Sequence, residues 1–242
     1  RQLISERDPN FKWCSNYLIA HEDCVEKIVQ QIVEHVCLCH KNNSSYILAC
    51  DKEYPPLLRE ISNFPLGLTV LGDLKTLNAR TCVSVVGSRK ASASALDTSF
   101  EIGERLAENK ISVVSGGAYG CDIVCHKGVL SAHLEENPRG AGVIVFAGGL
   151  ANTYPKGNLD TFQKILQRGG AWVSEKLWNQ GSYPCDFPVR NRIISGLSQR
   201  LILVEASKAS GALITANTSL DQGRDVWVWD HGYEDIRAQG NC

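Results

Sequence analysis

The sequence predicts an α/β fold in which helices flank both faces of a parallel sheet. Three short apolar runs, at residues 83–86, 111–114 and 142–147, support this prediction, and each meets a glycine within two positions of its end. Segments with apolar residues at helical spacing separate the runs. Because parallel neighbours need a long crossover connection, this alternation of strand and helix indicates parallel pairing.

The first 75 residues follow a different pattern. Six apolar residues recur at helical spacing between positions 25 and 36, which predicts an amphipathic helix over about residues 21–39. A polar stretch at 41–45 ends it, and prolines interrupt the elements between 54 and 66. We therefore expect a small helical N-terminal region at 1–75 and an α/β domain at 76–242.

The α/β domain continues to alternate toward the C-terminus. Apolar residues between Leu96 and Ala107 predict the first helix after the first strand. Further helices are expected at 122–132, 159–166, 190–197 and 212–220, and further strands at 171–174, 201–204 and 226–228.

Composition restricts the class of protein. The chain has 242 residues, 43% of them hydrophobic, which is enough for a sizeable core. It has no run of eighteen apolar residues and no signal-peptide pattern, so we expect a cytoplasmic protein without membrane association. The formal net charge is −1, so any nucleic-acid contact must come from a local cluster of Arg and Lys. The ten cysteines include no Cys-x-x-Cys pair, which predicts neither a metal site nor a disulfide framework.

Loops with glycine at the ends of the first three strands are the first candidate site. They are Gly87-Ser88-Arg89, Ser115-Gly116-Gly117-Ala118-Tyr119-Gly120 and Gly148-Gly149. Ligands bind outside the carboxyl ends of such strands, where glycine permits close approach and helix N-termini attract anions. Arg89 adds a planar donor suited to phosphate. We interpret these loops as a phosphate-binding site; alternatively, each glycine only makes a tight turn. Neither a dinucleotide fingerprint nor a P-loop is present.

The second candidate site is the stretch Arg190-Asn191-Arg192 at the start of a predicted helix. Two cations and an amide beside a helix N-terminus form a setting that favours phosphate. For both arginines the alternative is an internal salt bridge, for instance from Arg192 to Glu175 or Glu205.

Two smaller constellations have both a structural and a functional interpretation. Ser210 and Gly211 follow a predicted strand, so Ser210 is either a helix N-cap alone or part of a pocket wall. Asp122 and His126 are four residues apart and share one helix face. We favour a structural role, with Asp122 capping the glycine loop and His126 packing beneath it, over a catalytic pair.

Taken in order, these motifs resemble the DprA/Smf family of DNA-processing proteins from about Tyr54 to the C-terminus. The matching segments are Gly87-Ser88-Arg89, Ser115 to Gly120 with Asp122 and His126, Gly148-Gly149-Leu150, Tyr154-Pro155, Ser174-Glu175, Phe187 to Ser198, Val204-Glu205-Ala206, Ser210-Gly211, Thr215-Ala216 and Gly223-Arg224. The segment Asp230-His231-Gly232 departs from the family's usual Pro-Gly.

The resemblance implies a Rossmann-like domain that binds single-stranded DNA and needs no cofactor. Members protect incoming DNA in natural transformation, help to load the RecA recombinase and usually form homodimers. In the family the Gly-Ser-Arg loop and nearby basic residues hold DNA phosphates. Here those would be Gly87, Ser88 and Arg89, with Arg190 and Arg192 as companions and Lys156 and Lys164 as weaker candidates.

The function expected is therefore binding without chemistry. The alternative is a nucleotide-binding enzyme, because the fold also resembles nucleoside-monophosphate phosphoribohydrolases. Those enzymes use a Pro-Gly-Gly-x-Gly-Thr loop with a nearby Glu. This chain has the loop from Ser115 to Gly120 instead, with no Glu in the following turn.

Overall fold

The computed structural model describes residues 22–78, 81–132, 140–208 and 210–230. The chain divides into two compact units, residues 1–42 and 43–242. The described part of the first unit is one helix, α2 (Glu22–Lys41), which confirms the predicted helix at 21–39.

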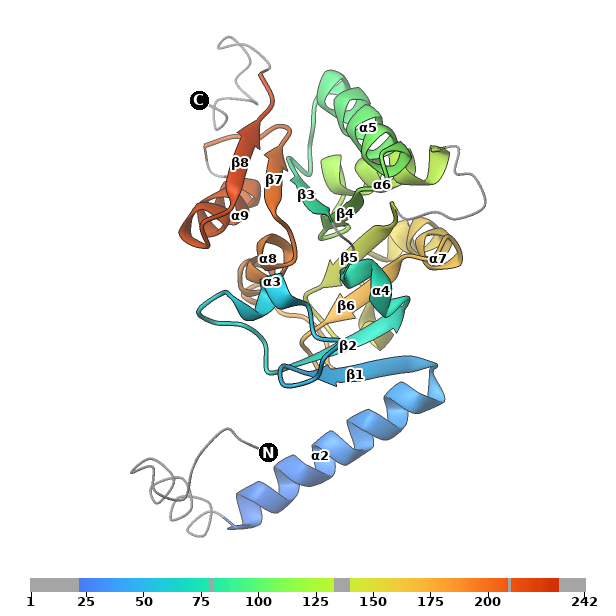
Figure 1. Ribbon diagram of the computed structural model, residues 1–242, viewed down its shortest axis with the longest axis vertical. Helices are drawn as coiled ribbons and strands as arrows, with labels where there is room; N and C mark the ends of the chain where they lie inside the picture. Colours follow the sequence, from blue (N-terminus) through green and yellow to red (C-terminus); the bar gives the residue numbers. More distant parts are fainter. Residues whose placement is uncertain (1–21, 79–80, 133–139, 209, 231–242) are drawn as a thin grey trace. The chain divides into compact units, whose positions relative to one another are not determined.

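The second unit is built on an eight-stranded sheet in the order β1-β2-β6-β5-β4-β3-β7-β8 (Figure 1). The strands are β1 (Ser44–Leu48), β2 (Gly67–Gly72), β3 (Cys82–Val86), β4 (Ser112–Ser115), β5 (Gly142–Phe146), β6 (Ala171–Ser174), β7 (Arg200–Leu203) and β8 (Asp225–Val228). All pairings from β6 to β8 are parallel, as predicted, whereas β1 pairs with β2 and β2 with β6 in antiparallel fashion.

Helices cover both faces of this sheet, which confirms the predicted Rossmann-like α/β class. They are α3 (Pro56–Arg59), α4 (Leu74–Leu77), α5 (Ala93–Glu108), α6 (Cys121–Ser131), α7 (Leu159–Gln167), α8 (Asp186–Gly196) and α9 (Gly211–Asp221), with 3-10 turns η1 (Leu150–Asn152) and η2 (Lys156–Asn158). In Figure 1, α5, α6 and α7 lie on one side of the sheet and α3, α8 and α9 on the other. Strands β3 and β5 are buried along their whole length, which explains why their sequences are continuously apolar.

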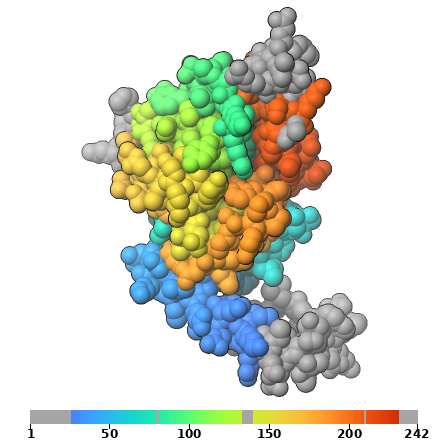
Figure 2. Space-filling view, turned by 180° about the vertical axis from the view of Figure 1, so that it is seen from behind, coloured from blue at the N-terminus to red at the C-terminus, as the bar shows by residue number. Residues whose placement is uncertain are grey.

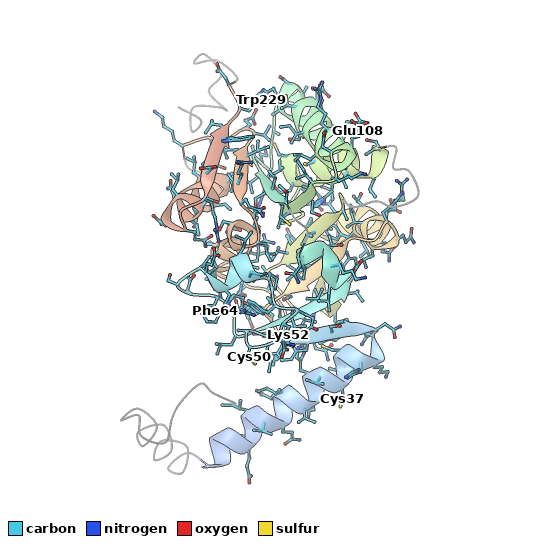
Figure 3. The ribbon with its side chains drawn as sticks, in the orientation of Figure 1. Cys37, Cys50, Lys52, Phe64, Glu108 and Trp229 are labelled. Atoms are coloured by element: carbon cyan, nitrogen blue, oxygen red, sulfur yellow. The ribbon has the colours of Figure 1, made fainter. Side chains whose placement is uncertain are left out.

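The organisation of the first 75 residues differs from the expected one. The compact units divide between Asn42 and Asn43 rather than near residue 75, and the sheet already begins at Ser44. Both β1 and β2 belong to this sheet. The prolines that suggested a separate region flank α3 and precede β2, whose first four residues are buried. Phe64, which lies in this stretch (Figure 3), packs against the core of the same unit.

The strand order reverses at β3. The chain runs from β3 through β4, β5 and β6 in one direction and then returns to β7 on the opposite side of β3. In the space-filling view, the green surface near α5 accordingly borders the red-orange surface of the C-terminal elements (Figure 2). Ligands of open parallel sheets bind at such a reversal, beyond the carboxyl ends of the strands. Within the described residues, no helix has both the length and the apolar character to cross a membrane.

Candidate functional site

A cleft of about 840 Å³ opens at the carboxyl ends of β3 and β7, at the reversal of strand order. Its size lies within the range of about 300–1,000 Å³ that is usual for ligand sites. Among the residues that line this cleft are Gly87, Ser88, Arg89, Lys90, Asp122, Tyr154, Phe187, Arg190, Asn191, Ser207, Ser210 and Gly211.

The loop after β3 forms one wall of the cleft and is held at both ends. The Ser88 Oγ accepts a hydrogen bond from the Lys90 N–H at 3.1 Å. Ser92 caps α5 by accepting from the N–H of Ala95, and its own hydroxyl donates to the buried Glu205 carboxylate at 2.6 Å. Because Glu205 follows β7, it joins the two loops that flank the reversal.

Arg89 and Lys90 project from this loop as exposed cations. Neither joins a salt bridge with any residue that the structure describes. The Arg89 guanidinium lies over the ring of Phe187, 5.6 Å from its centroid. A chain with a net charge near zero therefore presents a local positive cluster at the cleft, the arrangement that phosphate binding requires.

The loops after β3 and β4 touch at Gly120. The φ of Gly120 is +79°, and a Cβ there would overlap the carbonyl oxygen of Ser88. The N–H of Cys121, at the start of α6, donates to that same oxygen at 3.2 Å. Glycine at position 120 therefore fixes the place of the Ser88–Arg89 segment.

Three N–H groups of the loop after β4 donate to side chains inside the protein. Asp122 accepts from the N–H of Gly116 at 3.1 Å and of Ala118 at 3.3 Å. The Ser115 Oγ accepts from the N–H of Gly117 at 3.2 Å. These bonds shape the loop and occupy the N–H groups of Gly116 and Gly117. Of the phosphate-binding residues expected here, Ser115, Gly116, Gly117 and Gly120, none lines the main cleft, and Gly116 lines a smaller hollow.

Asp122 and His126 act on this loop separately. The His126 Nε2 lies 2.9 Å from the Ser115 Oγ, and burial lowers the pKa of His126 to about 4, so the ring is neutral near pH 7. Burial raises the pKa of Asp122 to about 6, and the charge of Arg190 opposes this increase. Asp122 thus accepts from the loop N–H groups, and His126 contacts Ser115, as a structural role for both residues predicts. Within the described residues, no hydrogen bond joins Asp122 to His126 as a catalytic pair would need.

Arg190 is a buried charge beneath the cleft. It is only 7% exposed, and burial lowers its pKa to about 10, so it remains cationic near pH 7. Its Nη1 donates to the carbonyl oxygen of Gly116 at 3.3 Å and also to that of Val145. Arg190 therefore supplies positive charge to the cleft while its donors hold the ends of β4 and β5 together.

Three other predicted cations lie away from the cleft. The Arg192 Nη2 donates to both carboxylate oxygens of Glu175, at 2.6 and 2.8 Å, which is the internal salt bridge considered as the alternative. Lys164 pairs with Asp160 one helical turn earlier, and Lys156 lies on η2. None of the three cations lines the cleft.

Ser210 and Gly211 lie where both interpretations place them. Ser210 caps α9 by accepting from the N–H of Ala212 at 3.1 Å, and both residues line the cleft.

Sequence reasoning missed Lys90, Tyr154 and Phe187 as cleft residues. Lys90 directly follows the Gly-Ser-Arg motif, and this position in the sequence is enough to predict that it lies at the cleft. The two aromatic residues stand in matching motifs, but only the fold brings them beside Arg89. The described residues contain no group of three or more His, Cys, Asp or Glu side chains arranged to hold a metal ion.

Comparison with known families gives the chain its identity. A sequence model of the family described as DNA recombination-mediator protein A matches residues 45–242. The chain belongs to the DprA/Smf family. It is 35% identical over 199 residues to Protein Smf of Escherichia coli (strain K12), an alignment that covers 82% of this chain and 51% of that protein. It is 33% identical to DNA processing protein DprA of Bacillus subtilis (strain 168), covering 73% of this chain and 57% of the relative. The chain thus spans about half the length of the curated DprA/Smf relatives it matches.

Solved DprA structures share the fold. The X-ray structure of DNA processing protein A from Streptococcus pneumoniae matches with a TM-score of 0.73 at 32% identity, over 81% of this chain and 66% of that one. DNA processing protein A from Helicobacter pylori, described for its single-stranded DNA binding mode, matches with a TM-score of 0.71 at 23% identity. That match covers 81% of this chain and 85% of the other.

Proposed function

We propose that the chain binds single-stranded DNA, with backbone phosphates held by the loop from Gly87 to Lys90. The observation that carries this proposal is the pair of exposed cations, Arg89 and Lys90, which line a ligand-sized cleft without a salt-bridge partner among the described residues. Buried Arg190 adds a fixed positive charge below them. A narrow site of this kind needs few cations, which agrees with the net charge of −1.

The relationship to other DprA/Smf proteins supports the choice of ligand. The Helicobacter pylori protein, which has the same fold, binds single-stranded DNA. A cleft lined by both cations and aromatic rings suits a strand whose phosphates and base faces are both accessible. In a duplex the base faces are stacked on one another.

The proposed role involves no bond making. Asp122, Ser115 and His126 are the side chains near the cleft that could act as acid, base or nucleophile. Each of them contacts a group of the loop after β4. Binding at the loop after β3 uses none of these groups. We propose that the protein acts as a recombination mediator that protects incoming DNA in natural transformation.

We further propose that two copies associate through the surface formed by helix α9 and by β8, the strand at one edge of the sheet. Leu220, Trp227, Val228 and Trp229 are 44–59% exposed there, and Trp229 directly follows β8 (Figure 3). A strand edge with exposed apolar side chains favours pairing. Once one cleft of such a dimer holds a DNA strand, the second cleft meets the same strand at a high effective concentration, so the dimer binds more tightly than either cleft alone.

The dimer proposal has a direct test. Leu220→Glu should produce a monomer by light scattering at a concentration where the parent protein is a dimer. Leu66→Glu is the matched control, because Leu66 is 76% exposed and lies on another part of the unit. A dimer that survives Leu220→Glu would place the interface elsewhere.

Loading of RecA recombinase onto the bound strand is the partner function we propose. It is tested by following RecA assembly on DNA coated with single-strand-binding protein. The chain should shorten the lag, and Arg89→Ala should restore it. An unchanged lag with the parent protein would remove RecA loading from the proposal.

The DNA-binding proposal is tested by fluorescence anisotropy with a labelled oligo-dT and with a duplex of equal length. We expect the single strand to bind more tightly. With about three phosphates neutralised, the affinity should fall roughly 20-fold for a fourfold increase in salt. Equal affinity for both DNAs, or no binding at low salt, would contradict the proposal.

A further inference from the structure

An aromatic group lies beside the loop after β3. Phe187, in the first turn of α8, has the Arg89 guanidinium 5.6 Å and the Arg190 guanidinium 6.0 Å from its ring centroid. Tyr154, between η1 and η2, meets the Phe187 ring edge-to-face, with centroids 5.8 Å apart and planes at 73°. Phe187 therefore links the cationic loop to Tyr154.

The Tyr154 ring is open to solvent, unlike the aromatic rings of the core. It is 52% exposed, whereas the core rings Phe146 and Phe162 are at most 2% exposed and pack edge-to-face on each other. No described residue forms a hydrogen bond with the Tyr154 hydroxyl or covers its exposed side. About half of this ring is therefore available for contact with a ligand.

The exposed ring borders the same hollow as the phosphate-binding cation. Tyr154 lines the main cleft, and together with Arg89, Tyr119 and Phe187 it also lines a smaller hollow next to it. Tyr119, across this hollow, is itself 48% exposed. The Arg89 guanidinium, which has no ion-pair partner among the described residues, and the exposed Tyr154 ring thus line the same hollow. A nucleotide presents a phosphate and a base to such a pair of groups.

We propose that Tyr154 is a stacking platform for a nucleobase of the DNA strand whose phosphate Arg89 holds. The inference rests on the proposed function and adds a base-binding subsite to it. Phe187 packs against this ring in an edge-to-face contact, and its own ring has the guanidinium groups of Arg89 and Arg190 within 6.0 Å of its centroid. The Phe187 ring is therefore less open to a base than the ring of Tyr154. Because every base has a π-face, such a subsite is tolerant of sequence and favours unpaired strands.

The test compares two single strands that carry the same number of phosphates. One is oligo-dT, and the other is an oligomer of equal length in which every base is missing. We expect the parent protein to bind oligo-dT about 5- to 100-fold more tightly than the abasic strand, the range of one stacked base. Tyr154→Ala should remove most of this preference and leave affinity for the abasic strand within about twofold.

Two further variants separate stacking from a structural role. Tyr154→Phe keeps the ring and should keep the preference for bases, whereas Tyr154→Leu keeps apolar bulk and should lose it. Tyr183→Ala is the matched control, because Tyr183 is 69% exposed near the cleft but does not line it. We expect this control to bind both strands as the parent does.

The possible failures are distinguishable. Absence of binding to either strand by the parent protein would overturn the proposed function and this inference with it. Binding of both strands by the parent with equal affinity would overturn the inference alone. An equal loss of affinity for both strands in Tyr154→Ala would also overturn it, since Tyr154 would then act by positioning Arg89.

Discussion

Arg190 lies directly against Gly116. A Cβ atom at position 116 would stand 2.6 Å from the Arg190 Nη2, and the Nη1 of the same guanidinium donates to the Gly116 carbonyl oxygen at 3.3 Å. A larger residue in place of this glycine, in the loop after β4, would therefore force the guanidinium of Arg190, which comes from α8, to shift. This contact ties two motifs, more than seventy residues apart in sequence, into one cleft.

Gly116→Ala should displace Arg190 and disturb the cleft. Insertion of one methyl group into a tightly packed site costs about 1–3 kcal/mol of unfolding free energy. Affinity for oligo-dT should fall as well, because Arg190 supplies charge to the cleft. Thermal unfolding and anisotropy measure the two effects. Gly181→Ala is the control, since no atom would lie within 4 Å of its Cβ. Equal losses of stability and affinity in the two variants would show that the contact between Gly116 and Arg190 is unimportant.

Arg192 should matter for stability and not for DNA binding. Its Nη2 donates to both carboxylate oxygens of Glu175, and the pair is partly buried, with side-chain exposures of 13% and 32%. Loss of such a pair in Arg192→Ala should lower the unfolding free energy by about 1–3 kcal/mol. Affinity for oligo-dT should stay within about twofold of the parent value. A large loss of affinity without a loss of stability would return Arg192 to the DNA site.

DNA binding should strengthen as pH falls, through Asp122. Burial raises the pKa of this carboxyl to about 6, with the charge of Arg190 opposing the increase. Protonation removes a negative charge beneath the phosphate site, so affinity should increase roughly 3- to 10-fold between about pH 7 and pH 5. Asp122→Asn should flatten this dependence, and a variant that retains it would assign the effect to another group.

The raised pKa of Asp122 also makes the free energy of unfolding depend on pH in a known direction. Its folded pKa lies above the ordinary value of 3.8, so the folded state holds the proton more tightly than the unfolded chain does. The stabilising contribution of protonated Asp122 is therefore complete below about pH 4 and is lost as pH rises through about 6. Urea unfolding of the parent and of Asp122→Asn across this range should show the difference.

The parallel part of the fold was predictable because its signals are local. Buried strands such as Val83 to Val86 are short and apolar, and the helices between them keep their apolar spacing. The antiparallel strands β1 and β2 were not predicted. Their place in the sheet depends on pairing between β2 and β6, which are about a hundred residues apart, and prolines around α3 obscure the local pattern.

The candidate site was predictable only in part, for a similar reason. The loop with Gly87, Ser88 and Arg89 follows from its position after the first parallel strand. Whether a cation faces solvent or a carboxylate depends on three-dimensional neighbours: Arg190 and Arg192 are two residues apart, yet one lines the cleft and the other pairs with Glu175. Tyr154 becomes a candidate only because η1 and η2 place it against Phe187.

The phosphate site at the carboxyl end of β3 is tested most directly by comparing Arg89→Ala with Arg105→Ala in oligo-dT binding at low salt. Both changes remove one positive charge, but Arg89 lines the cleft whereas Arg105 is 72% exposed on α5 and pairs with Glu101. We predict that Arg89→Ala lowers affinity by roughly 10- to 100-fold, as expected for loss of a charge-assisted phosphate contact. Arg105→Ala should change it by no more than about twofold. Equal losses in the two variants would mean that DNA responds to overall charge, and would contradict a phosphate site at the carboxyl end of β3.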